Sequence, residues 1–320
     1  MKEYDFINTQ WLIMVFLLIS GCYYPLKTIH TPQKFIEEEK KAWQQELKAY
    51  AFRHQQTKNC RKAITETVRY KKPDRFYPLC EDFLWMPGCL SYENNALGHF
   101  DFTGSSPDSA RILVFSLIHG DEFLAGELAL HWIERLQSID SRNTWRILPL
   151  TNPDGLKRGI RANSRGVDLN RNFPTEDWEK SALHHWKTRT REDPRRYPGS
   201  GPASEKETVC LLQHIEDFQP HFIVSLHTPY EVLDFDGPTS IPAPPYHELP
   251  WRPLGNFPGS LGRFMWVDFK TPVLTVELGN KLVDIKHLQD VIGSFALKAK
   301  ASGEPPSFFQ LPAQPIETGH

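Results

Sequence analysis

The sequence predicts an α/β fold with a mixed, largely parallel central sheet that is flanked by helices on both faces. Short apolar runs that end in turns alternate with segments of helical periodicity, the pattern of buried strands joined by helices. Of the 320 residues, 40% are hydrophobic and 24% are charged, so the chain can bury a sizeable core. The net charge of -2 gives no general attraction to nucleic acid, and we expect no nucleic-acid partner.

The first element along the chain is a candidate export signal. Residues 11–19 (WLIMVFLLI) are strongly apolar and have the length of a signal-peptide core. The stretch Ile19-Ser20-Gly21-Cys22 resembles a bacterial lipobox, in which the cysteine is lipidated and becomes the mature N-terminus. We therefore expect residues 1–21 to be a lipoprotein signal peptide and Cys22 to anchor the chain to a membrane. Tyr23 rather than Asp follows, which favours the periplasmic face of the outer membrane; the alternative is a buried N-terminal strand or helix.

A helical spacer is expected over residues 22–76. Thr31-Pro32 is typical of a helix N-cap followed by proline in the first turn. Phe35, Trp43 and Leu47 recur at roughly helical spacing among charged residues, and the pattern runs to about Tyr70. We expect the main domain over residues 77–300 and a Pro-rich tail over residues 301–320.

Within the main domain, apolar runs predict strands at 111–117, 144–150, 221–227 and 272–278. Helical periodicity predicts helices at 126–136, 204–218 and 282–298. Ser204 and Glu207 have the spacing of a capping box at the start of the second helix. Residues 152–201 and 238–258 are expected to be long surface loops, which carry function more often than framework in such folds.

Four cysteines remain beyond Cys22: Cys60, Cys80, Cys89 and Cys210. Four thiols allow three pairings, and sequence alone does not choose among them. In an oxidising compartment Cys80 and Cys89 could close a short loop. Free buried thiols are the alternative.

Candidate metal ligands follow two of the predicted strands. His119 and Glu122 come directly after the strand at 111–117, and His227 ends the strand at 221–227. Active-site residues of α/β sheets favour the carboxyl ends of strands. Two His and one Glu suit Zn²⁺, and three protein ligands leave a fourth position for water, as in catalytic sites. The alternative for His119 and Glu122 is a turn with a capping acid, and the alternative for His227 is a histidine buried in the core.

Two further polar features accompany these ligands. Arg161 and the stretch 168–173 (DLNRNF) supply amide and guanidinium donors that suit an anionic substrate, although a solvated charged loop is the alternative. Glu277 lies in an apolar strand, where desolvation would raise its pKa and make it a candidate proton shuttle. A structural salt bridge is the alternative for Glu277.

The order of these motifs resembles that of the M14 zinc metallocarboxypeptidases, over about residues 85–298. The matching segments are HGDE at 119–122, TNPDG at 151–155, RANSRGVDLNRNFP at 161–174, YPGSGPASEKET at 197–208, SLHTP at 225–229 and TVELG at 275–279. The resemblance implies the zinc carboxypeptidase fold and one zinc ion, held by His119, Glu122 and His227. It also implies that Glu277 takes a proton from the attacking water and passes it to the leaving amine.

The same resemblance implies roles for three more residues. Arg161 matches the arginine that stabilises the oxyanion, and Asn170 and Arg171 match the pair that holds the substrate's terminal carboxylate. Two departures point away from digestive-type members: Asp121 stands where they have arginine, and residues 254–262 lack their mobile tyrosine.

The resemblance extends to bacterial members that cleave the γ-D-glutamyl–diaminopimelate bond of cell-wall peptides. We therefore expect a zinc-dependent peptidase or amidase whose substrate is a peptidoglycan-derived or other small peptide. The alternatives are an N-acyl amino acid deacylase of the succinylglutamate desuccinylase or aspartoacylase type, and an inactive peptidase fold that binds cell-wall peptide. Asp234 and Asp236 are interpreted as turn-forming acids before Gly237-Pro238, with recognition of a substrate amine as the alternative.

Overall fold

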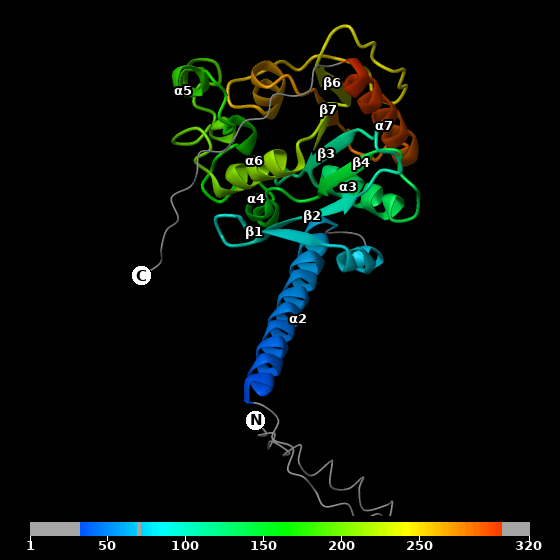
Figure 1. Ribbon diagram of the computed structural model, residues 1–320. Helices are drawn as coiled ribbons and strands as arrows, with labels where there is room; N and C mark the ends of the chain where they lie inside the picture. The colour runs from blue at the N-terminus through cyan, green and yellow to red at the C-terminus, as the bar shows by residue number, and fades with distance from the viewer. Residues whose placement is uncertain (1–32, 69–71, 303–320) are drawn as a thin grey trace, which may run out of the picture. The chain divides into compact units, whose positions relative to one another are not determined.

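The computed structural model describes residues 33–68 and 72–302, and its centre is a seven-stranded sheet of order β1-β2-β4-β3-β5-β7-β6 (Figure 1). The strands are β1 (Leu84–Leu90), β2 (Ala96–Phe102), β3 (Arg111–Ser116), β4 (Thr144–Leu148), β5 (Phe222–His227), β6 (Val232–Asp236) and β7 (Val273–Glu277). β4, β3, β5 and β7 are parallel, whereas β1, β2 and β6 are antiparallel to their neighbours. The predicted fold class is confirmed.

Helices cover both faces of the sheet (Figure 1). Alternate residues of β3 serve the two faces: Ile112 and Val114 pack in a core with α3 (Phe123–Leu136) and α7 (Ile285–Ser302). Leu113 and Phe115 pack in a second core with α6 (Lys206–Phe218) and the π-helix Arg263–Asp268. This alternation with period two is why an uninterrupted apolar run forms a strand here rather than a helix.

The predicted capping box at the start of α6 is wrong. Glu205 is the N-cap residue, and its side chain makes no capping hydrogen bond. Glu207 instead accepts hydrogen bonds from the backbone N–H of Tyr92 (3.2 Å) and from Asn163 Nδ2 (3.3 Å). These tertiary partners replace the local partner that the spacing suggests.

The prediction of one long loop over residues 152–201 is also wrong. This segment contains α4 (Pro153–Arg158) and α5 (Trp178–Thr188). Asn152 caps α4, since its Oδ1 accepts a hydrogen bond from the backbone N–H of Gly155 (2.9 Å). Trp178 and Ala182 bury one side of α5. Residues 238–258 contain no helix or strand, as predicted, and a single bridge joins Trp251 to Leu233.

The predicted N-terminal helix is α2 (Gln33–Thr67), which ends a turn earlier than expected. Contacts within the chain divide it into two compact units, and the boundary between them lies within α2, between Ala51 and Phe52. In the second unit, Cys60 and Ile64 are buried in the main core. The last turns of α2 therefore belong to the packed body, while the functional boundary at residue 77 stays a prediction.

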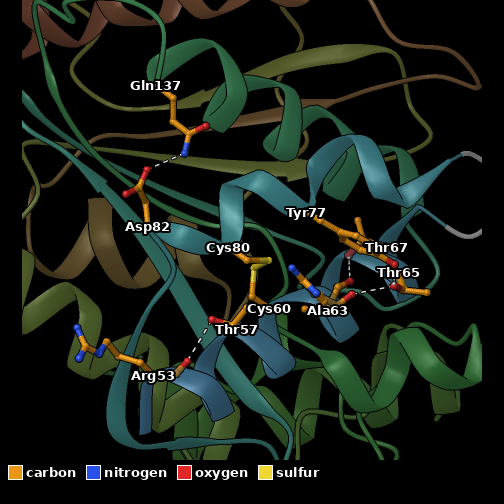
Figure 2. The surroundings of a disulfide bond; sticks show 11 residues. Arg53, Thr57, Cys60, Ala63, Thr65, Thr67, Tyr77, Cys80, Asp82 and Gln137 are labelled. Atoms are coloured by element: carbon orange, nitrogen blue, oxygen red, sulfur yellow. Dashed lines mark hydrogen bonds between the residues drawn. A yellow bond between two sulfur atoms is a disulfide. The ribbon is translucent and has the colours of Figure 1, made fainter. Parts of the chain in front are cut away.

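The four cysteines form two disulfides, and the short loop considered between Cys80 and Cys89 is not formed. Cys60 of α2 pairs with Cys80 in the 3₁₀ helix η1 (Pro73–Glu81), with Cα atoms 5.6 Å apart (Figure 2). Cys89 of β1 pairs with Cys210 of α6, with Cα atoms 5.0 Å apart. The two cysteines that are near in sequence lie in different elements and face different partners.

The expected signal peptide and the lipidation site Cys22 lie outside the described residues. Among the residues that are described, none of the helices combines the length and hydropathy that a membrane crossing requires.

Candidate active site

The candidate ligands and the candidate base gather at the carboxyl edge of the parallel strands. His119 and Glu122 lie in the turn between β3 and α3, and Glu122 is the residue before the first turn of α3. His227 is the last residue of β5 and Glu277 the last of β7, and the two pair in register. The order of the strands in the sheet thus brings three segments that are distant in the sequence to one edge.

Glu122 bridges the two histidines. Its Oε1 lies 2.8 Å from His119 Nδ1 and its Oε2 lies 2.8 Å from His227 Nδ1, and the two Nδ1 atoms are 3.1 Å apart. All three residues are 5% exposed or less, and their ligand atoms lie within 4.8 Å of one another. Burial alone would raise the pKa of Glu122, but the two imidazoles hold it below its ordinary value. Two imidazoles and one carboxylate that converge in this way fit Zn²⁺.

Both histidines are oriented by a second hydrogen bond. His119 Nε2 lies 3.2 Å from Asp168 Oδ1, and His227 Nε2 lies 2.9 Å from Ser225 Oγ. Such outer partners fix the ring orientation of metal-ligating histidines and raise their basicity. Asp168 belongs to the DLNR stretch, but its spacing from His119 gave no sign of this role.

Arg161 lies beside the candidate metal ligands. Its Nε (3.0 Å) and Nη2 (2.9 Å) donate to Asp168 Oδ2, and its Nη1 lies 3.1 Å from His119 Nδ1. Burial would raise the pKa of Asp168, but the charges of Arg161 and His119 hold it well below its ordinary value. The two-bond contact fixes the guanidinium plane and leaves Nη1 directed at the site.

Close backbone packing holds these loops together. Gly120 approaches the backbone of Gly155 so closely that any Cβ at position 120 would collide with it. Asn152 Nδ2 donates to the carbonyl oxygens of Ile118 (3.2 Å) and Arg161 (3.1 Å). The TNPDG segment thus acts as a structural tie between the loop of His119 and the loop of Arg161.

Glu277 faces the same space. Its Oε2 accepts a hydrogen bond of 3.4 Å from the backbone N–H of Tyr230, and the residue is 6% exposed. Burial raises the pKa of Glu277, the charge of His227 opposes this effect and the charge of Glu122 adds to it. A carboxyl with a raised pKa beside a metal-ligating group is suited to moving a proton.

Arg171 is a buried cation. It is 9% exposed, and its guanidinium carbon lies 4.6 Å from the ring centre of Phe257. Burial lowers the pKa of Arg171 to about 10, while the charge of Asp168 opposes the shift. Within residues 33–68 and 72–302, Arg171 forms no ion pair, and its Nη1 donates to the carbonyl of Asn170 (2.6 Å). The side chain of Asn170 is held by the backbone N–H of Leu261, which donates to its Oδ1 (2.9 Å).

One cavity of about 540 Å³ is lined by the three candidate ligands together with Arg161, Asn170, Arg171 and Glu277. It also exposes residues that the sequence did not single out, namely Tyr230, Arg195 and Arg196. Arg195 Nη2 donates to Asp121 Oδ2 (2.9 Å), so the acid that replaces the arginine of digestive-type members has a cationic partner. Tyr230 lies in a bend, and Arg195 and Arg196 lie in the three-residue 3₁₀ helix η3 (Pro194–Arg196), which is too short to show a periodicity in the sequence.

Asp234 and Asp236 lie in β6, and both line the cavity, so their interpretation as turn residues is wrong. Two residues apart on a strand, they project to the same side of the sheet. Burial raises the pKa of Asp236 to about 7, with the charge of Asp234 adding to the effect and a hydrogen bond from Asn256 opposing it. The lining of the cavity thus includes both cationic groups and an acidic pair.

A buried two-histidine, one-glutamate group at the carboxyl edge of such a sheet is typical of metallohydrolases. The chain belongs to the zinc carboxypeptidase family of M14 peptidases, which matches residues 89–251, just over half of its length. The resemblance noted in the sequence is thereby confirmed, and Zn²⁺ is the cofactor of this family.

Particular relatives can be named. Murein peptide amidase A of Escherichia coli (strain K12) is 35% identical over 163 residues, which cover 49% of this chain and 66% of the relative. The protein of the same name from Vibrio campbellii is 33% identical over 148 residues, which cover 45% of this chain and 59% of the relative. The chain therefore spans slightly under two thirds of the length of these relatives.

A solved structure shows the fold independently. Bovine thrombin-activatable fibrinolysis inhibitor, in complex with tick carboxypeptidase inhibitor, superposes with a TM-score of 0.51 at 16% identity. The match covers 71% of this chain and 93% of the other.

Proposed function

We propose that this protein is a zinc-dependent hydrolase that cleaves an amide bond in small peptides derived from peptidoglycan. The observation that carries the proposal is the buried group of His119, Glu122 and His227, with Glu277 in register beside His227. The three residues would hold one zinc ion, and the carboxylate of Glu277 would face the reacting atoms.

Each side chain has a distinct part in the proposed mechanism. When bound, the zinc ion polarises the scissile carbonyl and lowers the pKa of water. Glu277 accepts a proton from the attacking water and then donates it to the leaving amine, for which its raised pKa is suited. Arg161 donates through Nη1 to the oxygen that gains negative charge, and its bond to Asp168 keeps it in place.

Arg171 is proposed to bind the terminal carboxylate of the substrate. A buried guanidinium without an acidic partner is costly, and a substrate carboxylate would supply that partner. Asn170 lies next to it and lines the same cavity. Binding at this point would hold the substrate in the cavity that Glu277 also lines.

Arg171→Ala should raise KM by about 10- to 100-fold for peptides with a free terminal carboxylate, the size expected for a charged hydrogen bond. The same substitution should change KM little for the corresponding C-terminal amides. Steady-state kinetics on matched acid and amide substrates measures both. An equal rise in KM for the acid and the amide substrates would contradict a carboxylate-binding role.

The substrate proposed is a peptide with a γ-D-glutamyl–diaminopimelate bond, in line with the name of the murein peptide amidases. The diaminopimelate residue in such a peptide carries two carboxylates and one free ammonium group. Arg171, Arg195 and Arg196 supply cations for the former, and Asp234 and Asp236 supply anions for the latter. A cavity that served simple aliphatic residues would gain nothing from a pair of acids in its lining.

Asp236 predicts a pH dependence. Because its pKa is raised to about 7, Asp236 is largely protonated below that pH and binds an ammonium group only when ionised. KM for a substrate with this ammonium should therefore fall as the pH rises from about 6 to about 8. In Asp236→Asn this fall should disappear, and KM at pH 8 should be about tenfold higher. A substrate whose side-chain amine is acetylated provides the control, and the same pH profile for both substrates would contradict the assignment.

A substrate panel separates this proposal from the two alternatives. The zinc-loaded protein should have its highest kcat/KM on γ-D-glutamyl-diaminopimelate peptides. Preference for N-acyl amino acids would favour the deacylase class, and binding without turnover would favour the inactive peptidase fold.

We also propose that a lipid on Cys22 anchors the mature chain at the cell envelope, on the periplasmic face of the outer membrane. The two disulfides support an oxidising compartment. Mass spectrometry of the membrane fraction should find an N-terminus at Cys22 that carries acyl chains. Cys22→Ser should move the protein out of that fraction, and an unprocessed or unlipidated N-terminus in the wild type would overturn the proposal.

A further inference from the structure

A second group of potential metal ligands lies between β1 and α6. Cys89 comes from β1, and Cys210 and His214 come from one face of α6, since residues four apart on a helix are neighbours. The three residues are at most 1% exposed. One ligand atom from each lies within 4.8 Å of the other two.

His214 has an unusual environment within this group. Both of its ring nitrogens are buried, and neither has a hydrogen-bond partner. Its ring packs edge-to-face on that of His99, with ring centres 4.8 Å apart. Burial lowers the pKa of His214 to about 2, and the charges of His99 and Arg146 add to this effect. The imidazole is therefore neutral, with a lone pair that nothing in the described structure uses.

An unpartnered buried nitrogen costs free energy that a metal ion would recover. Two thiolates and a neutral imidazole are ligands that Zn²⁺ accepts, and a fourth position would remain for water or another ligand. Tetrahedral ligand atoms about 2.1 to 2.3 Å from one ion lie about 3.4 to 3.8 Å apart, so after reduction the two sulfurs move apart from bonding distance to take up a cation. Leu97, Trp85 and Met86 pack against the two cysteines.

The disulfide decides whether the site exists. While Cys89 and Cys210 are joined to each other, their sulfurs are not thiolates and do not ligate a cation. We propose that Cys89, Cys210 and His214 form a redox-controlled metal site, which binds a soft divalent cation such as Zn²⁺ once this disulfide is reduced. The site is separate from the proposed active site and does not depend on its chemistry.

A dithiol reductant transfers two electrons and two protons, so that the Cys89–Cys210 bond breaks into two thiols and the reductant becomes a disulfide. The divalent cation then displaces the two thiol protons, and His214 donates a nitrogen lone pair. Oxidation by a second disulfide compound reverses the sequence: it takes up two electrons, re-forms the Cys89–Cys210 bond and releases the cation.

The chain contains its own control. Cys60 and Cys80 form the other disulfide, and within residues 33–68 and 72–302 they belong to no such group of potential ligands. Reduction should therefore create a thiolate site at one disulfide and not at the other.

Cobalt substitution tests the proposal on the full chain. The protein is reduced with a dithiol, freed of it by gel filtration under argon and titrated with Co²⁺. A thiolate-to-cobalt charge-transfer band should appear, with one more Co²⁺ per chain than in the oxidised protein. The His119 site has only nitrogen and oxygen ligands, so it does not contribute this band, and loss of enzyme activity would leave the result unchanged.

Variants locate the band. The double variant Cys60→Ser/Cys80→Ser should retain it, and Cys89→Ser/Cys210→Ser should lose it. His214→Gln should weaken Co²⁺ binding at this site on the order of tenfold or more. Absence of the band in the reduced wild type overturns the proposal, as does its persistence in Cys89→Ser/Cys210→Ser. Because the wild-type comparison needs no substitution, a variant that fails to fold leaves the test intact.

Discussion

Glu277→Gln should lower kcat by about 10²- to 10⁴-fold, the contribution typical of a positioned acid–base group. The amide of glutamine keeps the shape of the side chain, and the hydrogen bond from the backbone N–H of Tyr230 changes little. The amide neither accepts a proton from water nor donates one to the leaving amine. Zinc content and KM should stay close to those of the wild type. Steady-state kinetics and metal analysis of the same preparation measure these quantities.

Glu231→Gln is the matched control for this substitution. Glu231 is an exposed carboxylate one residue from Tyr230 and does not line the cavity, so the same chemical change there should leave kcat unaltered. Wild-type kcat in Glu277→Gln would remove Glu277 from the mechanism. Loss of zinc from Glu277→Gln would instead make its role structural.

His227→Ala should lose both zinc and activity. The substitution removes one of three converging ligands and leaves the carboxylate of Glu122 buried with a single imidazole. After dialysis the variant should hold well under one zinc ion per chain, and its hydrolysis rate should fall to that of chelator-treated wild type. Metal analysis by mass spectrometry and the peptide assay measure the two effects.

The exposed His247 provides the comparison for this experiment. His247→Ala should retain zinc and rate, because this side chain lies outside the cavity. If His227→Ala kept a full complement of zinc, the ligand assignment would be contradicted. If chelation left the wild-type rate unchanged, the zinc mechanism as a whole would fail.

The parallel core of the fold was predictable because its strands are buried on both faces. The run at 111–117 is apolar at every central position, and the structure places β3 at Arg111–Ser116. The strands β2 (ALGHFDF) and β6 (VLDFD) were missed because they are antiparallel and carry polar residues, which read as turns or loops. Their pairing depends on neighbours far away in sequence.

The ligand group was predictable for a different reason. His119 follows one recognisable strand and His227 ends another, and the carboxyl ends of parallel strands meet at one edge of the sheet. The positions of Tyr230, Arg195 and Arg196 were not predictable, because a bend and a three-residue 3₁₀ helix gain their place only from tertiary contacts. The disulfides were unpredictable for the same reason: Cys89 and Cys210 are 121 residues apart, and only the contact of β1 with α6 brings them together.

The most direct test of the proposed activity identifies the bond that is cut and the source of the new oxygen atom. The zinc-loaded protein is incubated with L-alanyl-γ-D-glutamyl-diaminopimelate in ¹⁸O-labelled water, and the products are analysed by mass spectrometry. We expect free diaminopimelate without label, and a dipeptide that carries one ¹⁸O atom in its γ-carboxylate. Diaminopimelate that remains attached to glutamate, or a cut at the alanyl bond, would contradict the account.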